Sequence, residues 1–264
     1  MKKRWYNIFK EKDNKAFVLA MDHASSMDVT GILTDPGEII KKAKSGGVDA
    51  ILTTYGVAKK YSNEIGSMGL ILRIDGGITS IHPDRQVMNN VTSTFSVEDA
   101  VKIGADGIMS MGFVGLEDED KMIQMLSKNA SEADKWGLVF GAEMIPGGFK
   151  EESKRTLENI AFSARLGAEY GADFVKTCYS EESNSEEYRT VVENCYRPVL
   201  ILGGGKSKNA RDLFTMIKNA MKSGARGVVM GRNIWNNKNI DKYCRAISMI
   251  IHENADVEQA LKEL

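Results

Sequence analysis

Short, nearly continuous apolar runs alternate along this chain with longer segments whose apolar positions recur at helical spacing. Four of these runs share one pattern, in which a glycine, a small or apolar residue and a polar residue precede a strand-like stretch. They are GVDAILT (Gly47–Thr53), GADGIMS (Gly104–Ser110), GADFVKT (Gly171–Thr177) and GARGVVM (Gly224–Met230). Runs of this kind are typical of parallel strands covered on both faces. Each follows a helical segment, so we expect its glycine to end that helix.

Four further strand-like runs lie between the repeats. They are KAFVLAM (Lys15–Met21), GLILRI (Gly69–Ile74), GLVFGA (Gly137–Ala142) and PVLIL (Pro198–Leu202). Helical periodicity fills the gaps, and residues 75–101 are expected to hold an extended loop and a short helix. Eight strands in regular alternation with helices predict the α/β class, as a single (βα)8 TIM barrel domain over residues 1–264. The alternative is an open doubly wound sheet, which has less reason to show a four-fold repeat.

A lysine interrupts one of the four repeats. At the position of Lys176, the other three copies hold the apolar residues Leu52, Met109 and Val229. An ammonium group loses its hydration in a buried strand unless it is paired or neutralised. If this position faces the barrel interior, Lys176 lies at the carboxyl end of the sixth strand, where barrels carry their active sites. A lysine that reaches solvent or forms a structural ion pair is the alternative. The apolar residues at the same position of the other three copies favour a reactive amine.

The first predicted strand ends in Asp22 and His23. A carboxylate at this place would lie beside Lys176 across the barrel mouth, where it could orient hydroxyl groups or stabilise a cation. An N-cap of the next helix is the alternative for Asp22, although that helix is expected to begin only near Asp35 and Pro36. Strict alternation would turn Asp22 and His23 to opposite sides of the strand. We therefore predict a functional role for Asp22 and keep His23 as a second candidate.

The third and fifth strands also end in candidate groups. After the third come Asp75 and Gly76, and the double glycine that begins there permits close approach of a ligand to the backbone. An ordinary glycine turn explains this pair equally well. After the fifth come Glu143, a candidate acid or base, and Met144, a candidate pocket wall. The alternative for Glu143 is an exposed position, because most carboxylates in loops lie at the surface.

Glycine-rich stretches follow the last two strands. They comprise Gly203, Gly204 and Gly205 after the seventh strand, and Gly231 with Arg232 after the eighth. A helical segment comes after each. Barrels frequently bind phosphate between these two loops, through exposed backbone N–H groups and a helix N-terminus, and an arginine adds a charge-assisted hydrogen bond. Either stretch alone is weak evidence, but the two together predict a site for a phosphate group.

Composition excludes several classes of function. With 35 basic and 36 acidic residues the net charge is −1, so no surface for nucleic acid is indicated. No apolar run approaches the length of a membrane span, and the charged N-terminus lacks the apolar core of a signal peptide. Three cysteines and three histidines indicate neither a disulfide framework nor a metal centre. We therefore expect a cytoplasmic protein without a membrane partner, a metal or another cofactor.

A lysine on the sixth strand and a phosphate site after the seventh and eighth together describe a Schiff-base aldolase barrel. Along essentially its whole length, the chain resembles the archaeal-type class I fructose-bisphosphate aldolases of the broader DeoC/LacD aldolase group. The matching motifs are AMDH (Ala20–His23), FVKT (Phe174–Thr177), LGGG (Leu202–Gly205) and MGRNIW (Met230–Trp235). The resemblance implies a phosphorylated sugar as substrate, an imine at Lys176 with Asp22 acting near it, and a homo-oligomer. It also implies that the glycines of the two loops and Arg232 hold the phosphate.

One departure from the family concerns proton transfer. Aldolases of this type carry a proton-transferring tyrosine in a YPRG-like stretch after the fifth strand, and here that stretch is Met144-Ile145-Pro146-Gly147. Methionine in the tyrosine's place cannot exchange protons, which puts cleavage of fructose bisphosphate by the family mechanism in doubt. Glu143, His23, Tyr55 and Tyr179 are the alternatives. Glu143 stands one position off the expected inward side of its strand.

The predicted reaction is cleavage or formation of a carbon–carbon bond in a phosphorylated ketose through a lysine imine. Two siblings of the family share its motifs, the thiolase that ends autoinducer-2 breakdown and the synthase that makes an aminodideoxyheptulosonate. The segments LRIDGGITS and VKTCYS resemble the thiolase more closely, so transfer of an acyl or ketol fragment to an acceptor is the first alternative. A barrel that binds a phosphorylated sugar without turnover is the second.

Overall fold

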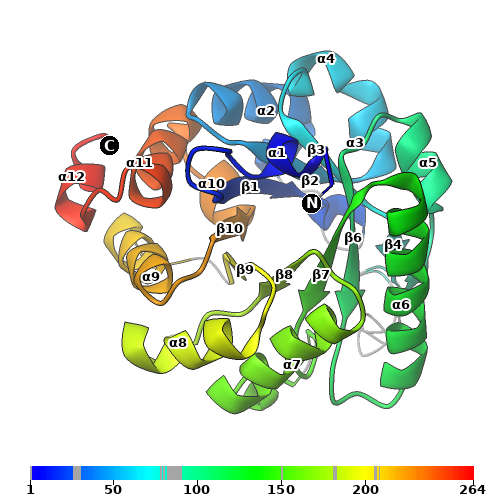
Figure 1. Cartoon of the computed structure of the whole chain (residues 1–264). Coiled ribbons are helices and arrows are strands. Elements are labelled where there is room, and N and C mark those ends of the chain that lie inside the picture. Colours follow the sequence, from blue (N-terminus) through cyan, green and yellow to red (C-terminus); the bar gives the residue numbers. More distant parts are fainter. Residues whose placement is uncertain are drawn as a thin grey trace.

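Eight parallel strands close into a barrel in the order β1-β10-β9-β8-β7-β6-β3-β2 (Figure 1). The protein is described by a computed structural model over residues 2–25, 31–77, 79, 81, 91–149, 151–180, 183–204, 207 and 209–264. The barrel strands are β1 (Ala16–Met21), β2 (Ala50–Thr53), β3 (Gly69–Arg73), β6 (Gly107–Gly112), β7 (Val139–Met144), β8 (Phe174–Thr177), β9 (Val199–Leu202) and β10 (Gly227–Met230). The predicted (βα)8 barrel is confirmed, and the open sheet is wrong.

Helices surround the barrel on its outer side, and the short first helix lies across one of its ends (Figure 1). They are α1 (Trp5–Ile8), α2 (Pro36–Ser45), α3 (Tyr55–Lys60), α4 (Ser62–Ile65), α5 (Val97–Lys102), α6 (Glu119–Trp136), α7 (Leu157–Glu169), α8 (Ser185–Asn194), α9 (Ala210–Lys222), α10 (Arg232–Trp235), α11 (Ile240–His252) and α12 (Val257–Leu261). As predicted, α2 begins at Pro36, with the Asp35 side chain accepting a hydrogen bond from the Glu38 N–H. A two-stranded hairpin of β4 (Asp75–Gly76) and β5 (Thr92–Ser93) precedes α5. Within the described ranges, no helix is long and apolar enough to cross a membrane.

The glycine that opens each repeat lies two residues beyond a helix. Gly47, Gly104, Gly171 and Gly224 have φ angles of 92°, 79°, 94° and 98°. This left-handed conformation is strained for residues with a Cβ atom, and it turns the chain from the helix into the next strand. The glycine recurs in the sequence because the same left-handed backbone conformation is needed after each of these four helices.

Apolar side chains fill the barrel and close one of its ends. Leu52, Met109 and Val229 belong to the interior cluster, as their place in the repeat predicted. On α1 and just after it, Trp5 and Phe9 stack with ring centroids 4.0 Å apart. This pair closes the amino-terminal end of the barrel, which faces the viewer in Figure 1. A ligand must therefore enter at the opposite end, where the strands finish.

A histidine joins the last turn of α11 to the closed end of the barrel. His252 Nδ1 lies 2.8 Å from Asp13 Oδ2, and its Nε2 lies 3.0 Å from Asp49 Oδ2. Asp49 also accepts a hydrogen bond of 2.7 Å from the Phe17 N–H at the start of β1. Burial alone would lower the pKa of His252, but the two carboxylates raise it. The imidazolium is thus the form that this contact favours.

The histidine contact predicts a pH dependence of stability. Because folding raises the pKa of His252, its protonation stabilises the fold fully below about pH 6.5 and less as pH rises through the folded pKa. His252→Gln should lower the free energy of unfolding by roughly 2 kcal/mol at pH 6, the cost of lost hydrogen bonds to charged groups. The deficit should shrink toward pH 9 in urea titrations of both proteins. A deficit that stays constant or grows with pH would contradict this assignment.

Candidate active site

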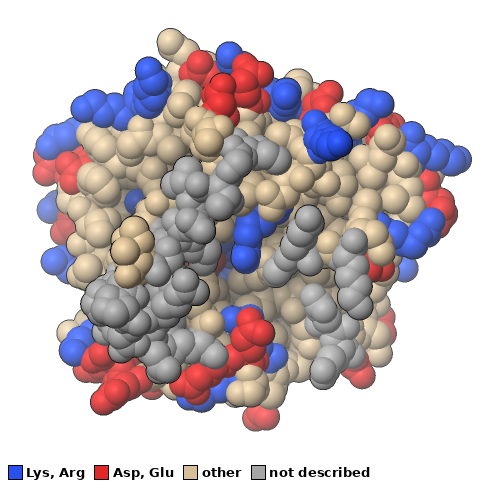
Figure 2. All heavy atoms as spheres, turned by 180° about the vertical axis from the view of Figure 1, so that it is seen from behind, with Lys and Arg blue, Asp and Glu red and all other residues tan. Residues whose placement is uncertain are grey.

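A cavity of about 330 Å³ lies at the carboxyl ends of the strands. Its described lining residues are Ala20, Asp22, His23, Met111, Glu143, Ile145, Phe149, Glu152, Arg155, Lys176, Cys178, Leu202, Gly203, Gly204, Val229, Gly231, Arg232 and Asn233. Figure 2 views the molecule from the side opposite to Figure 1 and shows Lys and Arg atoms at the centre of this face. The cavity therefore combines carboxylates and cations with apolar side chains, as a site for a small polar ligand requires.

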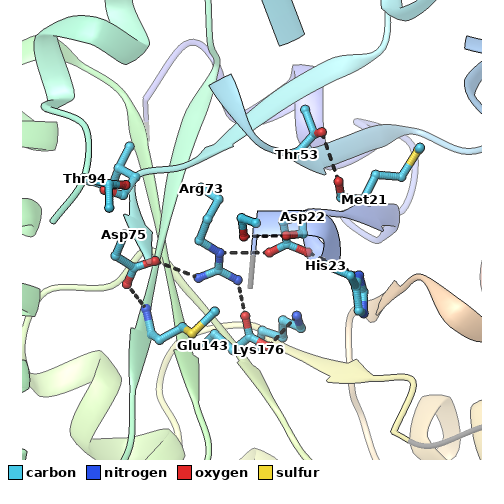
Figure 3. Close-up of polar contacts among 12 residues, drawn as sticks. Met21, Asp22, His23, Thr53, Arg73, Asp75, Thr94, Glu143 and Lys176 are labelled. Carbon is cyan, nitrogen blue, oxygen red and sulfur yellow. Dashed lines mark hydrogen bonds and ion pairs between the residues drawn. The ribbon is translucent and has the colours of Figure 1, made fainter. Parts of the chain in front are cut away.

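Lys176 projects from β8 into this cavity. Its side chain is buried, and its Nζ lies 2.5 Å from Glu143 Oε1 on the neighbouring strand β7 (Figure 3). The two residues are register partners in the parallel sheet. Lys176 thus points inward, as the repeat predicted. It also forms an ion pair, as the alternative interpretation expected. The contact provides a route for a proton between Lys176 and Glu143.

A buried arginine lies behind the lysine and was not predicted as a site residue. Arg73 comes from β3, and its guanidinium contacts three carboxylates (Figure 3). Its Nε lies 2.9 Å from Asp22 Oδ2 and its Nη1 3.3 Å from Asp75 Oδ1, while Nη2 donates to Glu143 Oε2. The signal that would have revealed it is the one that revealed Lys176, a charge within an apolar strand.

The two cations control the ionisation of the carboxylates at the cavity. Burial alone would raise the pKa of Asp22, but the charges of Arg73 and Lys176 lower it to about 2. Burial would likewise raise the pKa of Glu143, and Lys176 and Arg73 hold it below its ordinary value. Both groups are therefore carboxylates at neutral pH, so each can accept a proton or face a cationic intermediate.

Asp75 and Gly76 do not line the cavity, contrary to the sequence prediction. Asp75 lies on the other side of Arg73, where its Oδ2 accepts a hydrogen bond of 2.5 Å from the Met111 N–H. Burial raises the pKa of Asp75 to about 6 despite the opposing charge of Arg73. Gly76 pairs with Thr92 in the β4–β5 hairpin. Gly76 thus belongs to β4, and Asp75 and Gly76 are absent from the described lining of the cavity.

His23 lines the cavity beside Asp22. It lies in a single 3-10 turn after β1, with its Nδ1 3.6 Å from Asp22 Oδ1. Its ring packs edge-on against Trp235 at a centroid distance of 5.6 Å. Burial lowers the pKa of His23 against the attraction of Asp22, so the neutral imidazole prevails near pH 7. The turn, rather than strand alternation, allows both neighbours to face the same cavity.

The structure corrects the prediction for the segment after β7. Met144 is fully buried outside the barrel, where its side chain lies next to Gly112 of β6 and Gly167 of α7. Ile145, the residue immediately before Pro146, lines the cavity instead. Ile145, and not Met144, therefore corresponds to the family tyrosine, and its side chain likewise has no proton to exchange. Glu143 faces inward with Lys176, which corrects the expected orientation of its side chain.

Neither of the two candidate tyrosines is among the described lining residues. Tyr55 stacks on Phe95 with centroids 4.7 Å apart, and the Tyr179 hydroxyl donates to the Ser183 carbonyl at 3.3 Å. Among the candidates proposed for proton transfer, Glu143 and His23 are the ones at the cavity. Glu143 is the one in contact with Lys176.

The two glycine stretches meet at one side of the cavity. Gly203, Gly204, Gly231 and Arg232 all line it, and Gly205 lies outside the described residues. Arg232 Nη2 donates to the Gly204 carbonyl at 3.0 Å and so links the two loops. A Cβ atom on Gly231 would stand 2.4 Å from the Ala20 carbonyl oxygen, so only glycine fits there. The predicted loops are thus together, with their backbone open to the cavity.

A second arginine, not predicted from the sequence, lines the cavity on the side of β7. Arg155 Nη1 lies 2.9 Å from Glu152 Oε1, and its Nη2 donates to the Gly148 carbonyl at 2.9 Å.

The cavity lining also includes a cysteine. Burial raises the pKa of the Cys178 thiol to about 11, which leaves it protonated and unreactive at neutral pH. Within the described part of the chain, no three His, Cys, Asp or Glu side chains are grouped as metal ligands.

Comparison with known proteins identifies the family. The family model described as DeoC/LacD family aldolase matches residues 16–237. The chain belongs to this family. An uncharacterized aldolase of Saccharolobus solfataricus is 32% identical over 95% of this chain and 94% of its own length. The predicted family and enzyme class, a class I aldolase, are confirmed.

Two further similarities bear on the chemistry. The 2-amino-3,7-dideoxy-D-threo-hept-6-ulosonate synthase of Halobacterium salinarum is 31% identical over 94% of this chain and 91% of the synthase. A solved structure described as a Schiff-base-forming fructose-1,6-bisphosphate aldolase is 28% identical, with a TM-score of 0.84 over 95% of this chain and 99% of that one. The synthase and the aldolase are thus nearly equally similar to this chain.

Proposed function

We propose that this protein cleaves or forms a carbon–carbon bond in a phosphorylated ketose through an imine on Lys176. The observation that carries the proposal is the contact of 2.5 Å between Lys176 Nζ and Glu143 Oε1 inside a cavity that the two glycine loops border. A buried lysine beside a carboxylate has both a nucleophile and a proton acceptor in place. The phosphate would bind at Gly203, Gly204, Gly231 and Arg232, and Gly205 is included from the sequence pattern.

The first half of the reaction forms the imine. The Lys176 ammonium passes a proton to Glu143, and the neutral amine attacks the ketone carbon of the substrate. A nitrogen–carbon bond forms while the carbonyl π electrons move to oxygen, and a proton passes from the attacking nitrogen to that oxygen to give a neutral carbinolamine. The resulting hydroxyl leaves as water with a proton from the Glu143 carboxyl group, and an iminium remains. Asp22, ionised and adjacent, stabilises this cation and orients substrate hydroxyl groups.

The second half breaks the carbon–carbon bond. Glu143, again a carboxylate, removes the proton of the hydroxyl group on the carbon of the scissile bond that leaves as the aldehyde. The O–H electrons form the aldehyde carbonyl, and the electrons of the broken carbon–carbon bond flow into the iminium to give an enamine. The enamine avoids a bare carbanion, because the nitrogen accepts the electron pair. Protonation and hydrolysis release the second product, and the reverse sequence is aldol addition.

Borohydride trapping tests the proposed imine directly. The protein is incubated with a panel of phosphorylated ketones, reduced, and examined by intact-protein and peptide mass spectrometry. We expect one adduct per chain on the peptide that contains Lys176, with a mass that identifies the retained fragment. Unphosphorylated ketones provide the matched comparison. If a substrate is turned over and no adduct appears with it, the lysine mechanism is wrong.

The phosphate site predicts a selective loss of binding in Arg232→Met. Arg232 lines the cavity where the two glycine loops meet, and hydrogen bonds to charged groups contribute about 1.5–3 kcal/mol. We expect KM for the phosphorylated substrate to rise roughly 10- to 100-fold. Steady-state kinetics with the matching unphosphorylated ketone serve as the control, because that KM should barely change. An equal loss with both ketones would place the phosphate elsewhere.

Transfer of the fragment to a second substrate is the second candidate function. The 31% identity to the synthase of Halobacterium salinarum supports it as strongly as the aldolase likeness supports simple cleavage. Product formation that requires an added thiol or second carbonyl compound would establish the transferase, whereas cleavage without an acceptor would establish the lyase. The cytoplasmic location, the homo-oligomer and the single domain stay predictions from the sequence.

A further inference from the structure

We propose that Arg73 is a positioning residue that keeps Glu143 ionised and directed at Lys176 throughout the catalytic cycle. The inference rests on the proposed function, because it assigns a task to the group behind the proposed proton acceptor. Arg73 is not among the described residues that line the cavity, and its side chain is only 2% exposed. It therefore acts on the reaction through Glu143 and Asp22, and the substrate stays out of its reach.

The two oxygens of Glu143 have different partners. Oε1 lies 2.5 Å from Lys176 Nζ, and Oε2 accepts a hydrogen bond from Arg73 Nη2 (Figure 3). Lys176 changes from ammonium to amine to iminium during the proposed reaction, so it loses donors that it offers to Glu143. A guanidinium keeps its charge and its fork of donors in every state. The contact with Arg73 can thus hold Glu143 in place while the contact with Lys176 changes.

The position of Arg73 is fixed by more than one contact. Asp22 on the cavity side lies 2.9 Å from its Nε, and Asp75 on the far side lies 3.3 Å from its Nη1. Burial lowers the pKa of Arg73, but the three carboxylates together raise it well above its ordinary value. A buried guanidinium with several partners of opposite charge is rigidly placed, since any rotation leaves a charge unpaired. This rigidity is what a positioning residue needs.

The charges around Lys176 show what the loss of Arg73 would do. With Arg73 present, the cluster holds two cations and three carboxyl groups. Without it, Lys176 alone would face the carboxylates, and mutual repulsion would raise the pKa values of Glu143 and Asp22. Glu143 would then carry a proton at the start of the bond-breaking step and could not remove the hydroxyl proton. The fall of kcat on the acidic side of its pH profile should therefore occur at higher pH.

Kinetics of Arg73→Lys and of the double variant Arg73→Met/Asp75→Asn test the proposal. The double variant removes one cation and one carboxylate together, so the buried charge balance and the fold are retained. We expect kcat to fall about 100-fold in each, the cost of a misplaced catalytic group, with KM changed less than about threefold because Arg73 does not line the cavity. The acidic limb of the pH profile of kcat should shift upward in the double variant, which loses the cation, and less in Arg73→Lys, which keeps it. Arg197→Met, on the surface beside the Tyr196 ring, is the matched arginine control.

Two further readouts separate positioning from a merely structural role. Borohydride should still trap one substrate fragment per chain in the Arg73 variants, because Lys176 remains. In Arg73→Ala, added guanidinium should restore part of kcat, while the Arg197 control gains nothing. Unchanged pH profiles in every Arg73 variant, or no recovery of kcat with guanidinium, would overturn the inference. If the wild-type protein itself yields no adduct, the proposed function fails instead, and the two failures are distinguishable.

Discussion

Lys176→Met should lower kcat by at least about 10⁴-fold, the scale expected when the nucleophile of a covalent mechanism is removed. Methionine keeps most of the side-chain volume, so the packing of β8 is preserved while the amine is lost. The borohydride adduct should disappear at the same time, since no other lysine is among the described residues that line the cavity. Steady-state kinetics and mass spectrometry measure the two effects independently.

Lys128→Met is the control for this result, because Lys128 is an exposed lysine on α6. Turnover by the Lys128→Met variant and the amount of borohydride adduct that it forms should equal those of the wild-type protein. Circular dichroism and thermal unfolding of both variants show whether the fold is retained. Substantial turnover in folded Lys176→Met, or an adduct on a different lysine, would contradict the assignment of the nucleophile.

Glu143→Gln is expected to lower kcat by about 10²- to 10⁴-fold, the usual contribution of a general acid or base. The amide keeps the shape of the side chain and its contact with Arg73, but it cannot take up a proton from Lys176 or from the substrate hydroxyl. Formation of the imine should slow, yet the adduct with Lys176 should still accumulate when the substrate is in excess. Rapid-quench reduction at several times separates this slower imine formation from a loss of binding.

The matched control is Glu158→Gln, on the exposed first turn of α7. It removes a carboxylate of the same type without a contact to the cavity, so kcat and the adduct should not change. Turnover of Glu143→Gln within a few-fold of wild type would exclude Glu143 as the proton-transfer group. His23, the other candidate at the cavity, would then be tested next as His23→Gln.

Much of the fold follows from local features of the sequence. Gly47, Gly104, Gly171 and Gly224 mark the helix ends because a left-handed residue is needed there and glycine adopts it at least cost. The apolar runs after them are the strands, and their regular alternation with helices indicates the barrel. The comparison among the copies also showed that Lys176 occupies an inward position, because the same position holds core residues in the other three.

The orientation of individual side chains on β7 could not be obtained in this way. Alternation along a strand gives its two faces, but only a difference in polarity between the faces tells which one points inward. Every residue of β7 from Val139 to Met144 is buried, since the interior covers one face and helices cover the other. The phase of the alternation is therefore hidden. Met144 was predicted as a pocket wall where Ile145 lies, and Glu143 was predicted as an acid or base but placed off the inward side.

The sequence by itself determined the barrel, the inward position of Lys176 and the two glycine loops, because each depends on a local pattern of residues along the chain. Only the tertiary structure decided the surroundings of Lys176. Asp22 follows β1, Arg73 and Asp75 lie at the end of β3 and in β4, and Glu143 lies on β7, so these groups meet only when the barrel closes. Their pKa values follow from burial and from these contacts. Closure of the barrel thus creates the charge network that the proposed chemistry uses.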